Sequence, residues 1–171
     1  PIIGICNGFQ VLIKTDLLPG PISRPGQFVD PASHQTATLT NNDTGRYHDR
    51  WIRLSSKSTK CVWTNGVEDF DCPMAHGEGK FVPADDTTRQ ALWDDDRIAL
   101  VYVKPDGSPA AGAVPHNPNG SVDDIAGVCN EGRNVVGLMP HPERACHRLV
   151  GSVDGAVLLR SLLVSAGARV G

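Results

Sequence analysis

The segment Pro1-Ile2-Ile3-Gly4-Ile5-Cys6-Asn7-Gly8 puts a cysteine between two glycines, directly after an apolar run. The apolar run predicts a buried strand, and the helical spacing of apolar residues over residues 9–17 predicts a helix after it. A Gly-x-nucleophile-x-Gly segment between a strand and a helix is typical of a nucleophile elbow. Cys6 is therefore the candidate nucleophile, and the backbone N–H of Asn7 is the candidate donor to an oxyanion. A buried structural cysteine is the alternative.

A base for this thiol is predicted near the other end of the chain, in Pro140-His141-Pro142-Glu143-Arg144. A free thiol is mostly protonated at neutral pH, although the start of a helix favours the thiolate. Pro142 favours an extended segment, in which the side chains of residues i and i+2 point to the same side. We therefore expect Glu143 to orient the His141 ring, and His141 to face Cys6. A merely packed His141 in a proline-rich turn is the alternative.

The composition indicates an ordinary globular chain. It has 171 residues, of which 40% are hydrophobic and 20% charged, and its formal net charge is −3. No basic block and no long apolar stretch is present, so neither nucleic acid nor a membrane is an expected partner. The five cysteines are scattered without a CxxC pair, which favours reduced thiols and a cytoplasmic location. The acidic run Asp94-Asp95-Asp96 is interpreted as a solvated turn, and no metal site is expected.

The remaining pattern predicts an α/β domain with added antiparallel strands. A helix is expected from Asp86 to Asp94. Short strands are expected at Ala37–Thr40, Trp51–Leu54, Cys61–Trp63, Ile98–Val103, Ile125–Val128 and Val135–Met139. We expect one domain over residues 1–171. Because an elbow strand normally lies inside a sheet, we also expect that N-terminal strands and helices of this domain are missing from the chain.

Five strings resemble a known family. The elbow, with Phe9 and Gln10 after it, resembles the nucleophile motif of the class I (triad) glutamine amidotransferases. More narrowly, the elbow and four further strings resemble the glutaminase subunits of phosphoribosylformylglycinamidine synthase. The four further strings are Pro73–Phe81, Asn117–Ser121, Gly137–Arg144 and Gly151–Gly155. Residues 24–70 contain no string that we recognise.

The resemblance implies a flavodoxin-like α/β fold and hydrolysis of the side-chain amide of glutamine through a cysteine thioester. By motif, Cys6 is the nucleophile, His141 is the general base and then acid, and Glu143 is the orienting carboxylate. Gln10 matches a glutamine that helps line the substrate pocket, with a solvent-facing helix residue as the alternative.

The resemblance also assigns the substrate-binding segment. The backbone of Ala75, His76 and Gly77 matches the segment that holds the α-amino and α-carboxylate groups of the substrate, and Asn7 adjoins it as the oxyanion donor. His76 is interpreted as a wall of the pocket or a subunit contact, not as a second base. The string Asn117–Ser121 is expected to face the pocket or a partner.

The resemblance further implies partners. Ammonia would pass to a large ATP-dependent synthetase subunit, with a small accessory subunit in the same complex, in de novo purine (IMP) biosynthesis. ATP and Mg²⁺ are expected on the synthetase and no cofactor in this chain, since Gly77-Glu78-Gly79-Lys80 lacks the P-loop spacing. The family takes a second oxyanion donor from a loop upstream of the elbow, and we expect that loop to be missing here.

Two other functions stay open. A cysteine peptidase or another hydrolase on the same α/β scaffold also uses an elbow cysteine, but it needs an open cleft and a carboxylate from elsewhere. A non-catalytic regulatory relative would be expected to lack one of the three triad candidates, and all three are present in this sequence.

Overall fold

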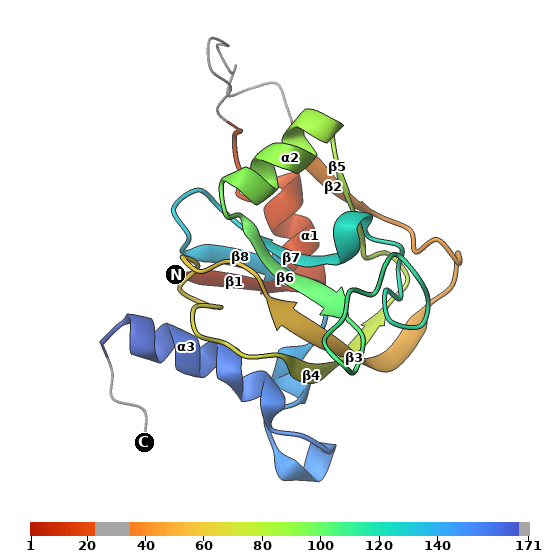
Figure 1. Cartoon of the computed structure of the whole chain (residues 1–171), viewed down its shortest axis with the longest axis vertical. Coiled ribbons are helices and arrows are strands. Elements are labelled where there is room, and N and C mark those ends of the chain that lie inside the picture. Colours follow the sequence, from red (N-terminus) through yellow and green to blue (C-terminus); the bar gives the residue numbers. More distant parts are fainter. Residues whose placement is uncertain (23–34, 168–171) are drawn as a thin grey trace.

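The computed structural model describes residues 1–22 and 35–167, which form an α/β structure (Figure 1). The strands are β1 (Ile2–Ile5), β2 (Ala37–Thr40), β3 (His48–Ser56), β4 (Phe70–His76), β5 (Lys80–Pro83), β6 (Ile98–Val103), β7 (Ile125–Cys129) and β8 (Val135–Leu138). The α-helices are α1 (Asn7–Lys14), α2 (Asp86–Asp94) and α3 (Val157–Ser165). Short 3₁₀ turns lie at Val122–Asp124, Pro142–Arg144, Arg148–Val150 and Asp154–Ala156.

Six of the strands form one sheet in the order β1-β8-β7-β6-β3-β4, and β2 and β5 pair as a separate ribbon. The pair of β1 and β8 is parallel, with Ile2 opposite Val135 and Ile5 opposite Leu138. The other pairs in the described residues are antiparallel. Since parallel strands end at the same edge of a sheet, the residues that follow β1 and β8 are brought together there.

Apolar clusters lie on both faces of the sheet. The helices α1 and α2 are on one side of it and α3 is on the other (Figure 1). On the first side, Phe9 of α1 is fully buried and stacks on Phe81 of β5, with ring centroids 6.3 Å apart. On the second side, Leu158 of α3 packs with Trp63 and Met74 in a separate buried cluster. The predicted α/β fold class is therefore confirmed.

Most predicted strands are confirmed, but the strand predicted at Cys61–Trp63 is wrong. The backbone turns there, because the N–H groups of Thr64 and Asn65 both donate to the carbonyl of Cys61, at 3.1 and 2.9 Å. The turn docks on the β7–β8 hairpin through a hydrogen bond from Trp63 Nε1 to the Asn134 carbonyl. The residues Cys61–Trp63 are apolar because this docking buries them. An apolar run of three residues is too short to distinguish a turn from a strand.

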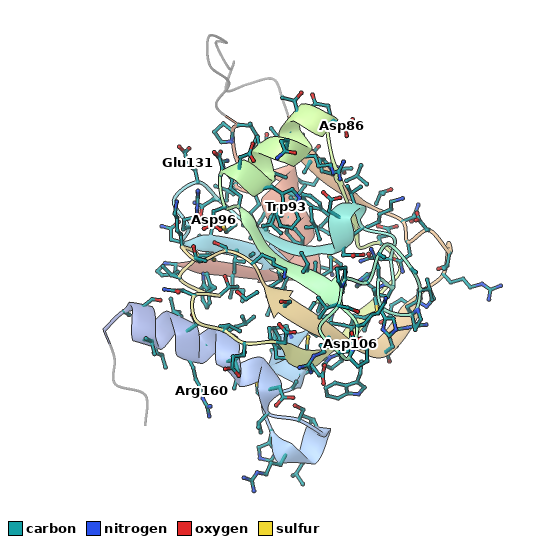
Figure 2. All side chains as sticks on the ribbon, in the orientation of Figure 1. Asp86, Trp93, Asp96, Asp106, Glu131 and Arg160 are labelled. Atoms are coloured by element: carbon teal, nitrogen blue, oxygen red, sulfur yellow. The ribbon has the colours of Figure 1, made fainter. Side chains whose placement is uncertain are left out.

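The acidic run at the end of α2 ties two loops together. The Asp96 carboxylate (Figure 2) accepts hydrogen bonds from Ser58 Oγ at 3.0 Å and from the backbone N–H groups of Thr59 and Lys60. Asp94 is exposed at the last position of α2, whereas Asp95 and Asp96 are half-buried, so the predicted solvated turn is correct only in part. In the described ranges, no group of three or more His, Cys, Asp or Glu side chains is arranged to hold a metal ion. No helix in those same ranges has the length and apolar character needed to cross a bilayer.

Candidate active site

Cys6 lies in a tight turn between β1 and α1. Its backbone has φ 52° and ψ −109°, and a non-glycine residue rarely adopts a positive φ. Gly4 makes this turn possible, because a Cβ atom at Gly4 would lie only 2.8 Å from the backbone carbonyl of Gly8. A Cβ atom at Gly8 would meet nothing within 4 Å. Of the two flanking glycines, only Gly4 is therefore required by space, and the strain of the turn is concentrated at Cys6.

The end of β8 brings His141 to the same pocket as Cys6. The backbone N–H of Cys6 donates to the carbonyl of Leu138, the last residue of β8, at 2.9 Å. His141 follows three residues later, and its own N–H donates to the carbonyl of Pro73 in β4 at 2.7 Å. These bonds anchor the backbones of both residues, and their side chains line one cavity.

His141 and Glu143 form a hydrogen-bonded pair. The Nδ1 atom of His141 lies 2.7 Å from Oε1 of Glu143. The His141 residue is only 6% exposed, and its Nε2 atom has no hydrogen-bond partner in the described part of the chain. One ring nitrogen is therefore bound to a carboxylate, while the other makes no hydrogen bond to any described residue, so the contact expected between His141 and the Cys6 thiol is not formed in this structure.

The backbone that produces this pair differs from the predicted one. An extended segment was expected, but Pro142–Arg144 form a 3₁₀ turn, and His141 precedes it with φ −114° and ψ 73°. Proline is favoured at the first position of a helical turn, because its missing N–H group needs no partner there. The contact between residues 141 and 143 is therefore correct, and the extended conformation from which we predicted it is wrong.

These groups line a cavity of about 620 Å³. Its lining contains all the predicted site residues except Glu143, which lies behind the His141 ring. The lining residues are Ile5, Cys6, Asn7, Gln10, Tyr47, Ala75, His76, Gly77, Glu78, His141 and Arg144. Arg144 and Tyr47 were not predicted as site residues. Arg144 belongs to a quoted string and could have been found, whereas Tyr47 comes from a region without a recognised motif.

The thiol of Cys6 is less acidic than the start of a helix suggests. Burial raises its pKa above the ordinary value, while the backbone N–H of Asn7 and the charge of Arg144 act in the opposite direction. The expected help from the helix start is therefore outweighed, because desolvation changes the pKa more than the favourable contacts do. The resting thiol is protonated at neutral pH and needs a base, and the unpaired Nε2 of His141 is available in the same cavity.

The turn between β4 and β5 forms a second wall of the cavity. Gln10 in α1 reaches it, since its Nε2 donates to the carbonyl of Glu78 at 2.9 Å. His76 is 5% exposed, and neither of its ring nitrogens has a hydrogen-bond partner in the described residues. Burial, with smaller contributions from His141 and His48, lowers the pKa of His76 to about 4. The His76 ring is therefore neutral at neutral pH.

The string Asn117–Ser121 supports this turn from behind and does not line the cavity. Asn119 is buried, and its Nδ2 donates to the carbonyl of Gly79 at 2.8 Å and to Tyr102 Oη at 3.1 Å. Ser121 is also buried, and its Oγ accepts a hydrogen bond from the N–H of Phe81 at 2.9 Å. The string therefore does not face the pocket, and the other role expected for it, contact with a partner, stays a prediction.

Comparisons with known proteins show which family and which solved structures this chain resembles. Residues 2–156 match the domain family described as the CobB/CobQ-like glutamine amidotransferase domain. Among solved structures, the structure of PurLQS from Thermotoga maritima aligns with a TM-score of 0.70 and 34% sequence identity. That alignment covers 96% of this chain and 61% of the matched chain.

Curated relatives share the same name. The phosphoribosylformylglycinamidine synthase subunit PurQ of Treponema denticola is 45% identical over 150 residues, which are 84% of this chain and 55% of the relative. The PurQ subunit of Thermomicrobium roseum is 42% identical over 174 residues, covering 99% of this chain and 64% of the relative. The chain thus spans less than two thirds of the length of either relative.

Proposed function

This chain belongs to the CobB/CobQ-like glutamine amidotransferase domain family, and on that premise we propose that it is the glutaminase component of phosphoribosylformylglycinamidine synthase. It hydrolyses glutamine through a thioester at Cys6 and delivers ammonia to an ATP-dependent synthetase subunit in de novo purine biosynthesis. The observation that supports this most is one cavity that holds Cys6 and His141, with Glu143 hydrogen-bonded to His141 at 2.7 Å.

The reaction uses each of these groups in turn. The Nε2 atom of His141 accepts the thiol proton, and the sulfur of Cys6 bonds to the carbon of the side-chain amide. The amide oxygen becomes negatively charged, and the backbone N–H of Asn7 donates to it. The C–N bond then breaks, and the imidazolium gives its proton to the leaving ammonia. Water next attacks the thioester with His141 as base, which releases glutamate and restores the thiol.

Glu143 contributes to this reaction through His141. Its carboxylate accepts the Nδ1–H of the ring, which leaves Nε2 free to accept a proton, and it stabilises the imidazolium once that forms. The raised pKa of Cys6 makes this assistance necessary, because a protonated thiol is a weak nucleophile.

The substrate is held by the second wall. The backbone of Ala75, His76 and Gly77 binds the α-amino and α-carboxylate groups of glutamine, while Gln10 fixes the adjoining carbonyl of Glu78. His76 serves as a neutral wall and not as a second base, which agrees with its lowered pKa and with the lack of a carboxylate on its ring in the described residues.

The relatives support a multisubunit setting. They are named as subunits of a synthase, and the solved relative is titled as PurLQS. We therefore assign ATP and Mg²⁺ to a large synthetase subunit, and we expect a small accessory subunit in the complex. Free thiols at all five cysteines support a reducing, cytoplasmic location. The one sheet shared by both apolar clusters supports a single domain over residues 1–171.

The test is the Cys6→Ala variant of the full-length protein assembled with its synthetase. Glutamine-dependent synthesis should fall to background, because no nucleophile remains, while ammonia-dependent synthesis should continue. Cys146→Ala is the matched control, since Cys146 is a half-buried thiol outside the cavity lining. It should leave both activities intact.

An electrophilic glutamine analogue gives an independent measurement. Mass spectrometry should find it on Cys6 in the wild-type protein and in Cys146→Ala, and nowhere in Cys6→Ala. Loss of ammonia-dependent synthesis in Cys6→Ala, or labelling of another cysteine, would contradict the proposal. Glutamine-independent cleavage of an unstructured protein substrate would favour a peptidase instead.

A further inference from the structure

Asn42 makes an unusually complete set of contacts for a residue between two strands. It follows β2, in the region where the sequence contains no recognised motif, and it is only 2% exposed. Its side-chain Nδ2 donates to the carbonyls of His76 and Arg46, both at 2.9 Å. Its Oδ1 accepts a hydrogen bond from the N–H of Gly79 at 3.2 Å. Three of the four hydrogen bonds that the side-chain amide can make are therefore formed.

The backbone of Asn42 contacts the same turn. Its N–H donates to the carbonyl of Gly77 at 2.9 Å. Together with the side-chain bonds to His76 and Gly79, one residue thus fixes three of the four positions from 76 to 79. Two of these three, His76 and Gly77, line the cavity.

Asn42 also holds the neighbouring loop. Its bond to the carbonyl of Arg46 fixes the residue directly before Tyr47, which lines the cavity. Gly77 lies against Tyr47, since a Cβ atom at Gly77 would be 3.8 Å from the Tyr47 Cα atom. The side chain of Asn42 therefore joins two parts of the cavity wall that contain neither Cys6 nor His141.

We propose that Asn42 is a positioning residue for glutamine binding, which fixes the backbone of residues 76–79 so that the wall keeps one geometry toward the substrate. This inference rests on the proposed function and extends it to a residue that touches neither the substrate nor the reacting atoms. A backbone wall binds α-amino and α-carboxylate groups well only if it is already ordered, because ordering it during binding weakens affinity.

The test is Asn42→Ala in the full-length protein assembled with its synthetase. Removing the three side-chain hydrogen bonds should raise the KM for glutamine on the order of tenfold. The value of kcat should change less, within about threefold, because Cys6, His141 and Glu143 are untouched. The rate at which iodoacetamide alkylates Cys6 should stay within about twofold of the wild-type rate, since this reagent has no α-amino or α-carboxylate group.

Ser58→Ala is the matched control. Ser58 is also buried, and its side chain makes three hydrogen bonds, to Asp96, Lys60 and Cys61, but it lies in the loop before β4, at the opposite end of that strand from residues 76–79, and does not line the cavity. Its loss should lower the melting temperature by a similar amount and leave the KM for glutamine within about twofold. An equal rise of KM in both variants would show that Asn42 acts only through general stability, and this would overturn the inference.

A second variant, Asn42→Asp, keeps the size of the side chain. The carboxylate accepts from Gly79 but cannot donate to His76, so KM should rise at about pH 8 and recover toward wild type at about pH 6, where a buried carboxyl group becomes protonated. A KM ratio to wild type that does not change with pH would overturn the inference. If the wild-type protein itself shows no glutamine-dependent activity, the proposed function fails and the inference with it. An active wild-type protein with unchanged KM in Asn42→Ala contradicts the inference alone.

Discussion

The cavity has two walls that obtain their shape in different ways. The elbow wall, residues 4–10, depends on a positive φ at Cys6 and on the small size of Gly4, both of which are local. The turn wall, residues 75–79, has no positive φ and depends on hydrogen bonds from Asn42 and Asn119, which lie 34 to 40 positions away along the chain. The wall to which we assign the chemistry is strained and local, and the wall to which we assign substrate binding is relaxed and held from a distance.

This difference has a physical basis. A nucleophile must stand away from its own backbone, and a tight turn with a positive φ achieves this at a cost of about 1–3 kcal/mol. A wall that binds charged backbone groups of a substrate needs its own N–H and C=O groups held at fixed positions, which side-chain amides from elsewhere can do without strain. The two walls should therefore respond differently to the addition of a single methyl group.

Gly4→Ala should have the largest effect on stability. The new Cβ atom would lie 2.4 Å from Leu12 Cδ1 and 2.8 Å from the backbone of Gly8, and backbone atoms cannot move aside without opening the elbow. We expect a loss of about 2–3 kcal/mol in the free energy of unfolding, measured by chemical denaturation, and loss of glutaminase activity.

Gly8→Ala is the control for this elbow variant. Its Cβ atom meets no atom within 4 Å, and residue 8 lies in α1, where alanine is the better helix former. The free energy of unfolding should be unchanged or higher by up to about 1 kcal/mol. Equal destabilisation by the two substitutions would contradict our conclusion that space requires glycine at position 4 but not at position 8.

Gly79→Ala should have a smaller effect. Its Cβ atom would lie 2.1 Å from Cε1 of the His76 ring, which is the end of a side chain and can turn more easily than a backbone. We expect a loss of about 1–2 kcal/mol in stability, and a rise in KM for glutamine as His76 moves within the cavity. Gly77→Ala, whose nearest contact would be 3.8 Å, should change stability much less. A larger loss at Gly79 than at Gly4 would reverse our ranking of the walls.

A further comparison concerns pH and the His76 ring of the turn wall. The pKa of His76 is about 4 in the folded protein and about 6.5 in the unfolded chain, so between these values only the unfolded chain binds this proton. Stability should therefore fall as the pH decreases from about 6.5 to about 4, with a slope of at most about 1.4 kcal/mol per pH unit from this group. His76→Gln should flatten that slope in denaturation curves. An unchanged slope would show that the turn wall does not titrate in this range.

The elbow and the His141–Glu143 pair could be predicted because their chemistry lies in residues that adjoin in the sequence. The glycines beside Cys6 indicate a tight turn, and the spacing of His141 and Glu143 indicates a contact between their side chains. The fold only has to bring these two local features together. The same local reasoning failed for backbone shape, since Pro142 begins a 3₁₀ turn instead of an extended segment. It failed again for the acidity of Cys6, because burial is a property of the whole fold.

The turn wall could be predicted only in part. Its own residues resemble a family string, but Asn42 and Tyr47 come from a stretch without a motif, and only the pairing of strands places them at the turn. The string Asn117–Ser121 was recognised, but its support of the turn from behind was not predicted, since a list of residues does not say which side of a turn they support. Contacts between distant segments are the information that a single sequence does not display.

The parallel pairing of β1 with β8 controls when the protein becomes reactive. A growing polypeptide displays the sulfur of Cys6 long before the ribosome has made His141, and closing so long a loop is a slow, late event in folding. Until that closure, no base is held near the sulfur. Nascent or partly unfolded copies therefore lack the assembled pair of thiol and base, and glutamine hydrolysis would begin only when the two ends of the chain have met.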